Sequence, residues 1–204
     1  VKLMTDAKGG VIGLVVKTDE GLHELPAKAV ILASGGFQAN PEMRAQYLGP
    51  GWDIVKVRGT RYDTGEGLRM ALELGAKPTG QWTGCHSAQV DASAPDLEMG
   101  DAAFRPSYTH SIMVNLNAKR FLDEGEDFPL YTYVKIGKIL LTQPRTWACQ
   151  IMDQKCIPLL QVFYRNAVPV TADTIEELAD KLGLDQETLV KTVRDYNNAV
   201  QDGP

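Results

Sequence analysis

Two tyrosines and a lysine between positions 131 and 135 have the residue types needed to move a proton. Tyr131 and Lys135 are four residues apart, so on a helix they share one face, with Tyr133 on another side. A lysine beside a tyrosine can lower the pKa of the phenol and let it give or take a proton. Tyr131 and Lys135 are therefore candidate catalytic residues. The competing interpretation is an amphipathic helix with a solvated lysine.

Arg105 is a candidate substrate-binding residue. It is the only cation in the irregular segment 91–107, which Pro95, Gly100 and Pro106 mark as loop. A guanidinium can hold a carboxylate through two parallel hydrogen bonds. An ordinary surface arginine explains this residue equally well.

Two glycine-containing segments have the backbone character of a cofactor site. Paired glycines leave N–H groups bare, so a flat cofactor can approach, although a tight turn with positive φ explains them as well. At a helix start, free N–H groups suit an anion or a polarised carbonyl, and an ordinary capped helix is the alternative. The two segments are Ala33-Ser34-Gly35-Gly36 and Thr64-Gly65-Glu66-Gly67.

The elements around the glycine segments are predicted from local patterns. Lys28–Leu32 is rich in β-branched residues and predicts a strand covered on both faces. Asn40 and Pro41 predict a helix over 41–48, and Thr64 predicts the N-cap of a second helix. Upstream, three β-like runs predict a small antiparallel sheet: Lys2–Thr5, Val11–Lys17 and Gly21–Leu25.

In the second half, Ser111–Asn115 and Arg120–Asp123 predict a β-hairpin around residues 116–119, and Trp147–Met152 predicts a strand. Two C-terminal helices are predicted to start at the N-caps Thr174 and Asp185. The buried stripe of the last helix is expected to contain Leu189, Val193, Tyr196 and Val200.

Composition excludes several classes of function. The 204 residues carry a net charge of −5 with scattered basic residues, which gives no support for nucleic-acid binding. No apolar run approaches the ~20 residues of a membrane span. The three cysteines have no CxxC spacing and indicate buried thiols in a reducing compartment, which favours a cytoplasmic protein. Cys85 lies beside His86 without further ligands at metal spacing, so no metal site is expected.

Four blocks in a fixed order carry a family resemblance. They are VILASGGFQANPEMRAQYLG (30–49), RYDTGEGLRMALELGA (61–76), IMVNLNAKRFLDEG (112–125) and the C-terminal helical pair. In these blocks the chain resembles the FAD flavoproteins of the fumarate reductase/succinate dehydrogenase type. Within them it is most similar to the tricarballylate dehydrogenase-like branch.

The resemblance implies an α+β fold with FAD as cofactor. Residues 1–85 would be the remnant of a Rossmann-like FAD-binding domain with an antiparallel β insertion, and residues 86–204 would be an α+β capping domain. Both glycine segments would contact FAD, with Glu66 in place of the family's aspartate. His86 would hold a substrate carboxylate, and Tyr133 is a further substrate-binding candidate. The family's proton-donating arginine is missing, because Gly125–Pro129 stand in its place and the next arginine is Arg145.

The predicted function is an FAD-dependent dehydrogenase or reductase acting on a di- or tricarboxylate such as tricarballylate. An electron-acceptor protein or a quinone-linked partner is expected, with peripheral membrane attachment through that partner as an option. Two alternatives stay open: a flavin dehydrogenase of the same fold with a ketosteroid-like substrate, and a non-enzymatic α+β binding module.

The chain is expected to be an interior piece of a longer protein. It begins at Val1 and contains no G-x-G-x-x-G, the fingerprint of a dinucleotide site, since Met70 stands where a third glycine would follow Gly65 and Gly67. By itself the chain is therefore expected to be inactive and to bind FAD weakly or not at all.

Overall fold

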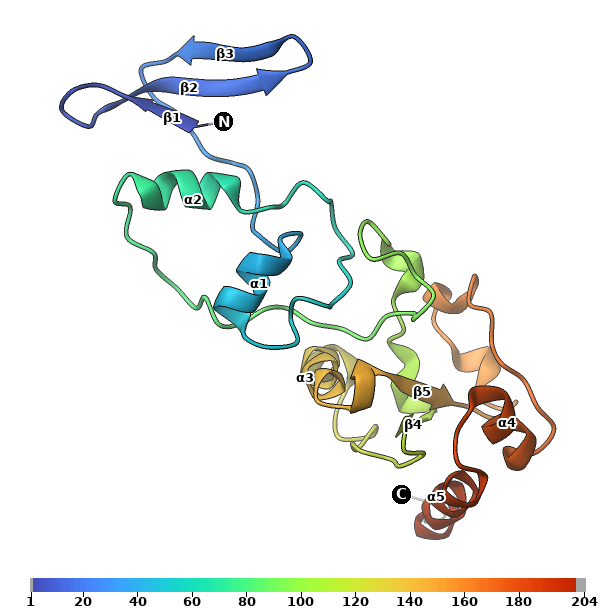
Figure 1. The fold of residues 1–204 in the computed structure, drawn as a ribbon. Helices are drawn as coiled ribbons and strands as arrows, with labels where there is room; N and C mark the ends of the chain where they lie inside the picture. Colours follow the sequence, from blue (N-terminus) through green and yellow to red (C-terminus); the bar gives the residue numbers. More distant parts are fainter. Residues whose placement is uncertain (1, 201–204) are drawn as a thin grey trace. The chain divides into compact units, whose positions relative to one another are not determined.

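The computed structural model of the chain describes residues 2–200. The chain divides into two compact units, 1–85 and 86–204. Figure 1 shows strands β1 to β3 with helices α1 and α2 in the first unit, and α3, β4, β5, α4 and α5 in the second. The division falls at the boundary expected for the two domains. Their roles as FAD-binding and capping domains stay predictions.

The first unit opens with the predicted antiparallel sheet. Its strands β1 (Lys2–Thr5), β2 (Val11–Thr18) and β3 (Gly21–Pro26) pair in the order β1-β2-β3. The first turn is stabilised by Asp6, whose Oδ1 accepts hydrogen bonds from the backbone N–H groups of Lys8 and Gly10, both at 2.8 Å. A short polar side chain that binds nearby backbone is typical of turns.

The predicted strand at Lys28–Leu32 is not present. In the described residues this segment pairs with no strand, and the side chain of Ile31 is 90% exposed. A strand covered on both faces requires neighbouring strands and covering elements, and the described part of the first unit has the β1–β3 sheet alone. The mixed helix and sheet content agrees with the expected α+β class, whereas residues 2–200 contain no Rossmann-like sheet.

The two helices of the first unit begin differently. Helix α1 (Pro41–Leu48) has the predicted cap, because Asn40 Oδ1 accepts from the N–H of Met43 at 3.1 Å. Helix α2 (Glu66–Glu73) is capped by Gly65 in the left-handed conformation, with φ 79°, so the prediction of Thr64 as N-cap was wrong. The backbone carbonyl of Thr64 instead accepts a hydrogen bond from the side-chain amide of Asn40.

The second unit is built on a two-stranded antiparallel sheet of β4 (Ile112–Asn115) and β5 (Ala148–Ile151). Three helices accompany it: α3 (Pro129–Leu141), α4 (Ile175–Leu182) and α5 (Gln186–Ala199). Short 3₁₀ turns connect these elements at Asp101–Ala103, Ser107–His110, Pro144–Thr146, Ile157–Leu159 and Val162–Tyr164.

The predicted hairpin after β4 is only half formed. The turn exists, with Ala118 at φ 57°, but beyond it a single bridge joins Val114 to Arg120. The carboxylate of Glu124 explains the missing strand. It accepts the N–H of Met113 at 2.6 Å and pairs with the guanidinium of Arg120, so a side chain replaces backbone pairing at this edge.

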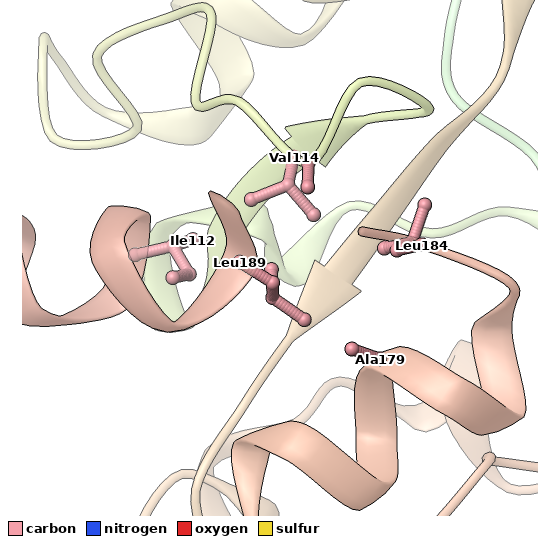
Figure 2. Close-up of a cluster of buried hydrophobic side chains, with 6 residues drawn as sticks. Ile112, Val114, Ala179, Leu184 and Leu189 are labelled. Atoms are coloured by element: carbon pink, nitrogen blue, oxygen red, sulfur yellow. The ribbon is translucent and has the colours of Figure 1, made fainter. Parts of the chain in front are cut away.

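Strand β4 contributes to two buried clusters because its side chains alternate between faces. Ile112 and Val114 pack with residues of α4, α5 and the link between them, as Figure 2 shows. Met113 packs on the other side with Tyr108 and with Ile136 of α3.

The C-terminal helices carry the predicted caps. Thr174 accepts from the N–H of Glu177, and Asp185 accepts from the N–H of Thr188. Leu184 and Leu189 are both buried, as the predicted contact across the start of α5 requires. The predicted stripe ends at Tyr196, however, because Val200 lies beyond the helix and is 57% exposed.

Candidate functional site

The two predicted cofactor segments lie against each other within the first unit. The N–H of Gly65 donates to the carbonyl of Gly36 at 2.9 Å, and the N–H of Ala39 donates to the carbonyl of Asp63, also at 2.9 Å. The amide of Asn40 adds a hydrogen bond to the carbonyl of Thr64 at 3.0 Å. Segments 30 residues apart in sequence are thus joined mainly through their backbones. We call residues 33–36 with 64–67 the glycine cradle.

Side chains larger than hydrogen do not fit inside the glycine cradle. A Cβ on Gly67 would lie 2.0 Å from the hydroxyl of Ser34, and one on Gly65 would lie 2.4 Å from the sulfur of Met43. Gly35 has φ 72°, and a Cβ there would lie 2.2 Å from a carboxylate oxygen of Asp63. The positive φ agrees with the turn interpretation of this glycine. At all three glycines the nearest atoms belong to side chains, so the absence of a Cβ leaves room for Ser34, Met43 and Asp63.

One edge of the glycine cradle faces solvent. Ala33, Ser34 and Gly35 are exposed, as is Glu66 at the first position of α2, while Gly65 is buried behind them. This edge combines exposed backbone, few bulky side chains, a helix N-terminus and an acidic side chain. Such a surface fits one face of a flat dinucleotide cofactor.

A buried arginine stabilises the residues that follow the first glycine segment. Arg44 of α1 is 5% exposed, and its guanidinium donates to the carbonyls of Gln38, Trp52, Asp53 and Val55. Burial lowers the pKa of Arg44 from its ordinary value, although the nearby charge of Asp53 opposes this. Sequence reasoning did not identify this residue, because α1 has no clear apolar face that would mark position 44 as internal.

In the second unit, His86 lies beside Tyr133. Their Nε2 and hydroxyl oxygen share a hydrogen bond of 2.6 Å, and the ring centroids are 5.2 Å apart in an edge-on arrangement. The structure therefore brings together the two residues for which the sequence predicted substrate binding through an imidazole and a phenol.

Close packing on α3 sets this geometry. The hydroxyl of Ser87 donates to the carbonyl of Val134 at 2.9 Å. A Cβ on Gly137 would lie 2.6 Å from the backbone nitrogen of Ala88, so this glycine lets the irregular segment 86–88 contact the helix directly. The sequence did not indicate a role for Gly137, because a glycine inside a helix by itself indicates only a lower helix stability.

Aromatic rings extend the group beyond Tyr133. The ring of Phe104 is 5.8 Å from that of Tyr133 and 5.3 Å from that of Phe163, in both cases edge-on. All three rings are half-buried. Sequence reasoning missed Phe104 and Phe163, since isolated phenylalanines in loops carry no periodic signal.

Arg105 forms an internal ion pair. Its Nη2 lies 2.7 Å from a carboxylate oxygen of Asp91, and its Nη1 donates to the carbonyls of Ala102, Phe104 and Phe163 at 2.8–2.9 Å. The guanidinium also lies 5.3 Å from the ring centroid of Tyr164. The described contacts of Arg105 thus hold loops of the second unit together, and its contact with a substrate stays a prediction.

This network changes two pKa values. Burial raises the pKa of a carboxyl, but hydrogen bonds from Ser93 and the ion pair with Arg105 outweigh it and hold the pKa of Asp91 below its ordinary 3.8. Burial raises the pKa of Tyr164 to about 12, against the opposing effect of its hydrogen bonds and the Arg105 charge.

Tyr131 and Lys135 share one face of α3, as expected, but their contacts differ from the prediction. The ammonium of Lys135 lies 2.5 and 2.6 Å from the two carboxylate oxygens of Glu126. Tyr131 is 78% exposed, and its ring lies edge-on to Phe128 with centroids 5.9 Å apart. A catalytic role for this pair stays a prediction.

No group of three or more metal-ligating side chains occurs among the residues that the structure describes. The thiols of Cys85, Cys149 and Cys156 are half-buried, and burial raises the pKa of Cys149. Within residues 2–200, no helix has the length and apolar character to cross a bilayer.

The first unit contains a glycine cradle and the second a histidine–tyrosine pair, and both features are compatible with a protein that uses a dinucleotide cofactor. Comparison with known protein families identifies the cofactor. Residues 1–203 match the model of the family described as FAD binding domain, so the chain belongs to this family, and FAD is the cofactor.

The chain is similar to a probable fumarate reductase of Shewanella frigidimarina, with 30% identity over 213 residues. It is also similar to a urocanate reductase of Eggerthella lenta, with 29% identity over 211 residues. These matches cover 100% and 99% of this chain and 34% of each relative. Among solved structures, the open conformation of a flavocytochrome c3 fumarate reductase superposes with a TM-score of 0.74 at 30% identity, covering 98% of this chain and 34% of that one. The chain spans about a third of the length of these relatives.

Proposed function

We propose that this protein is an FAD-dependent oxidoreductase that transfers hydride between the flavin and a carbon of a small carboxylate. The observation that carries the proposal is the glycine cradle, in which the Gly65 N–H contacts the Gly36 carbonyl behind an exposed backbone edge. The similarity to fumarate and urocanate reductases supports a carboxylate substrate.

The residues of the first unit would bind FAD. The exposed backbone of Ala33, Ser34 and Gly35 would lie against the cofactor, with Gly36 and Gly65 joining the two segments behind it. Thr64 would hold the second segment in place, and the exposed carboxylate of Glu66 would accept a hydrogen bond from a cofactor hydroxyl. When bound, FAD supplies the group that accepts or donates hydride.

The residues of the second unit would bind the substrate. The His86 imidazole can donate a hydrogen bond to a carboxylate oxygen, and Tyr133 beside it is a further substrate-binding candidate. Arg105 is a further substrate-binding candidate whose charge is shared with Asp91. Tyr131 with Lys135 is one candidate for proton transfer. The finer proposal is a tricarboxylate substrate such as tricarballylate, because residues 123–135 resemble that branch and lack the proton-donating arginine of fumarate reductases.

We also propose that the protein is cytoplasmic and that it passes electrons to an acceptor protein or a quinone-linked partner. The basis of this proposal is the sequence, namely three cysteines without CxxC spacing and the resemblance to this class of flavoproteins.

The test is turnover by the complete, FAD-loaded protein on three probes. Tricarballylate is assayed with an artificial electron acceptor, fumarate with reduced methyl viologen, and a 3-oxosteroid with the same acceptor. We expect turnover of a carboxylate probe and a loss of at least about 100-fold in kcat/KM in His86→Ala. Turnover of the steroid alone would overturn the carboxylate proposal, and full carboxylate turnover in His86→Ala would remove His86 from the site.

A further inference from the structure

Two tyrosines that are two positions apart on α3 have different surroundings. Tyr131 is 78% exposed and contacts the ring of Phe128. Tyr133 is half-buried, with its ring between those of His86 and Phe104 at centroid distances of 5.2 and 5.8 Å. A general acid or base needs a fixed position and partial exclusion of water. Of the two residues, Tyr133 meets both conditions.

The hydroxyl of Tyr133 also has a partner for proton transfer. It lies 2.6 Å from His86 Nε2, within the ~2.6–3.2 Å range over which a positioned acid and base exchange a proton. Imidazole can take or give a proton near neutral pH, and the exposed ring of His86 is open to exchange with solvent. A proton can therefore pass between solvent, His86 and Tyr133.

The rival pair lacks this arrangement. Both carboxylate oxygens of Glu126 lie within 2.6 Å of the Lys135 ammonium, so a negative charge neutralises the lysine locally. Activation of the phenol of Tyr131 would depend on the positive charge of Lys135, and the ion pair with Glu126 offsets that charge.

Backbone packing fixes the distance between His86 and Tyr133. The segment that carries His86 contacts α3 at Gly137, where a Cβ would lie 2.6 Å from the backbone nitrogen of Ala88. The hydrogen bond from Ser87 to the carbonyl of Val134 joins the same segment to the same helix. His86 and Tyr133 are therefore held on one rigid support.

We infer that Tyr133 is the residue that exchanges the proton with the substrate and that His86 relays it to solvent; this inference rests on the proposed function. In the reducing direction, bound FAD would supply the hydride for one carbon of the substrate, and Tyr133 would give its phenol proton to the other. The O–H bond of Tyr133 breaks as the new C–H bond forms. The phenolate then recovers a proton from His86 Nε2, and solvent restores the proton to His86. Dehydrogenation runs the same steps in reverse.

The experiment compares Tyr133→Phe with Tyr196→Phe in the complete, FAD-loaded protein. Each variant loses one hydroxyl from a half-buried ring of the second unit, and Tyr196 lies on α5 in the C-terminal core. The probes are fumarate with reduced methyl viologen and tricarballylate with an artificial acceptor. We expect Tyr133→Phe to lower kcat by about 100-fold or more while KM changes by less than about threefold. Tyr196→Phe should retain the wild-type kcat.

His86 is tested as a positioning and relay residue through the solvent deuterium isotope effect on kcat. In wild-type protein, proton transfer through His86 and Tyr133 contributes to this effect. In His86→Gln, whose amide can still hydrogen-bond Tyr133 but cannot relay a proton, we expect kcat to fall and the isotope effect to increase. An unchanged kcat and isotope effect in His86→Gln would overturn the relay.

Other outcomes separate the inference from the proposed function. A raised KM with unchanged kcat in Tyr133→Phe would reduce Tyr133 to substrate binding and overturn the inference alone. Loss of kcat in Tyr131→Phe, with normal kcat in Tyr133→Phe, would assign the proton to Tyr131 instead. Wild-type protein without turnover on either carboxylate would overturn the proposed function and this inference together.

Discussion

At the scale of single residues, Arg44 shows how much structure one side chain can organise. Its guanidinium binds four backbone carbonyls from residue 38 and from the loop 52–55, where no regular element would satisfy them. Gln38 in turn donates to the carboxylate of Asp63, which lies against Gly35. The arginine therefore supports the glycine cradle from behind without being part of its exposed edge.

Arg44→Met should lower the free energy of unfolding by about 2–4 kcal/mol, because several buried carbonyls lose a charged donor at once. Urea unfolding measures the effect. The matched control is Arg69→Met, which removes a side chain that is 63% exposed and pairs with Glu73 at 3.8 Å. That control should change stability by no more than about 0.5 kcal/mol, and equal losses in the two variants would contradict the role of Arg44.

The ion pair between Asp91 and Arg105 makes stability depend on pH. Because the pKa of folded Asp91 lies below its ordinary 3.8, the ionised carboxylate stabilises the fold above that value. This contribution is lost as the pH falls through the folded-state pKa. Asp91→Asn should therefore be less stable than wild type by about 1 kcal/mol at about pH 7, with a smaller difference at about pH 3.

Urea unfolding at the two pH values measures this difference, with Asp19→Asn as a control for a carboxylate in an exposed turn. A deficit in Asp91→Asn of the same size at both pH values would show that charge is not the cause.

Residue type predicted candidates more readily than it predicted contacts. The sequence identified Arg105 and Lys135 as cations near possible chemistry, but Asp91 lies 14 residues before Arg105 and Glu126 lies nine before Lys135. Such pairing depends on how loops fold back, and no local pattern encodes it. Phe104 and Phe163 were missed because isolated phenylalanines in loops have no periodic pattern.

At the scale of elements, Gly137 determines how α3 meets the segment that carries His86. Gly137→Ala should lower the free energy of unfolding by about 1–3 kcal/mol, because the new methyl group overlaps the backbone at Ser87 and Ala88. This loss is expected despite the ~1 kcal/mol by which alanine favours a helix interior over glycine.

Thermal and urea unfolding of Gly137→Ala measure the loss, and Gly125→Ala is the control, because its methyl group would have a nearest neighbour 3.7 Å away. Full stability in Gly137→Ala would show that the segment 86–88 can move away from α3 without cost.

Elements with local signals were predicted well, and elements with distant partners were not. Asn40, Thr174 and Asp185 cap helices through hydrogen bonds to residues three positions ahead, so the sequence contains the whole interaction. By contrast, Ile112 of β4 pairs with Ile151, 39 residues later, and the nearer segment 120–123 contributes only the bridge between Arg120 and Val114 in the described residues. Lys28–Leu32 has the composition of a buried strand without a strand beside it in the described residues.

At the scale of the whole molecule, the glycine cradle is the proposed contact for FAD, but the chain has no G-x-G-x-x-G. We therefore expect the 204-residue chain, purified alone and mixed with FAD, to lose the flavin on gel filtration. The complete protein should elute with the flavin absorbance. Absorbance and fluorescence of the protein peak measure this, and a yellow 204-residue chain would contradict the expectation.

The position of β4 between two buried clusters constrains how this sequence can diverge among relatives. The side chains of Ile112 and Val114 pack with residues of α4 and α5, whereas Met113 packs with Ile136 of α3, the helix that carries Tyr133. Substitutions at 112 and 114 should therefore co-vary with positions such as 179 and 189, and those at 113 with position 136. A one-residue insertion in this strand would exchange the two sets and disturb both cores at once, so natural length variation is expected to avoid it.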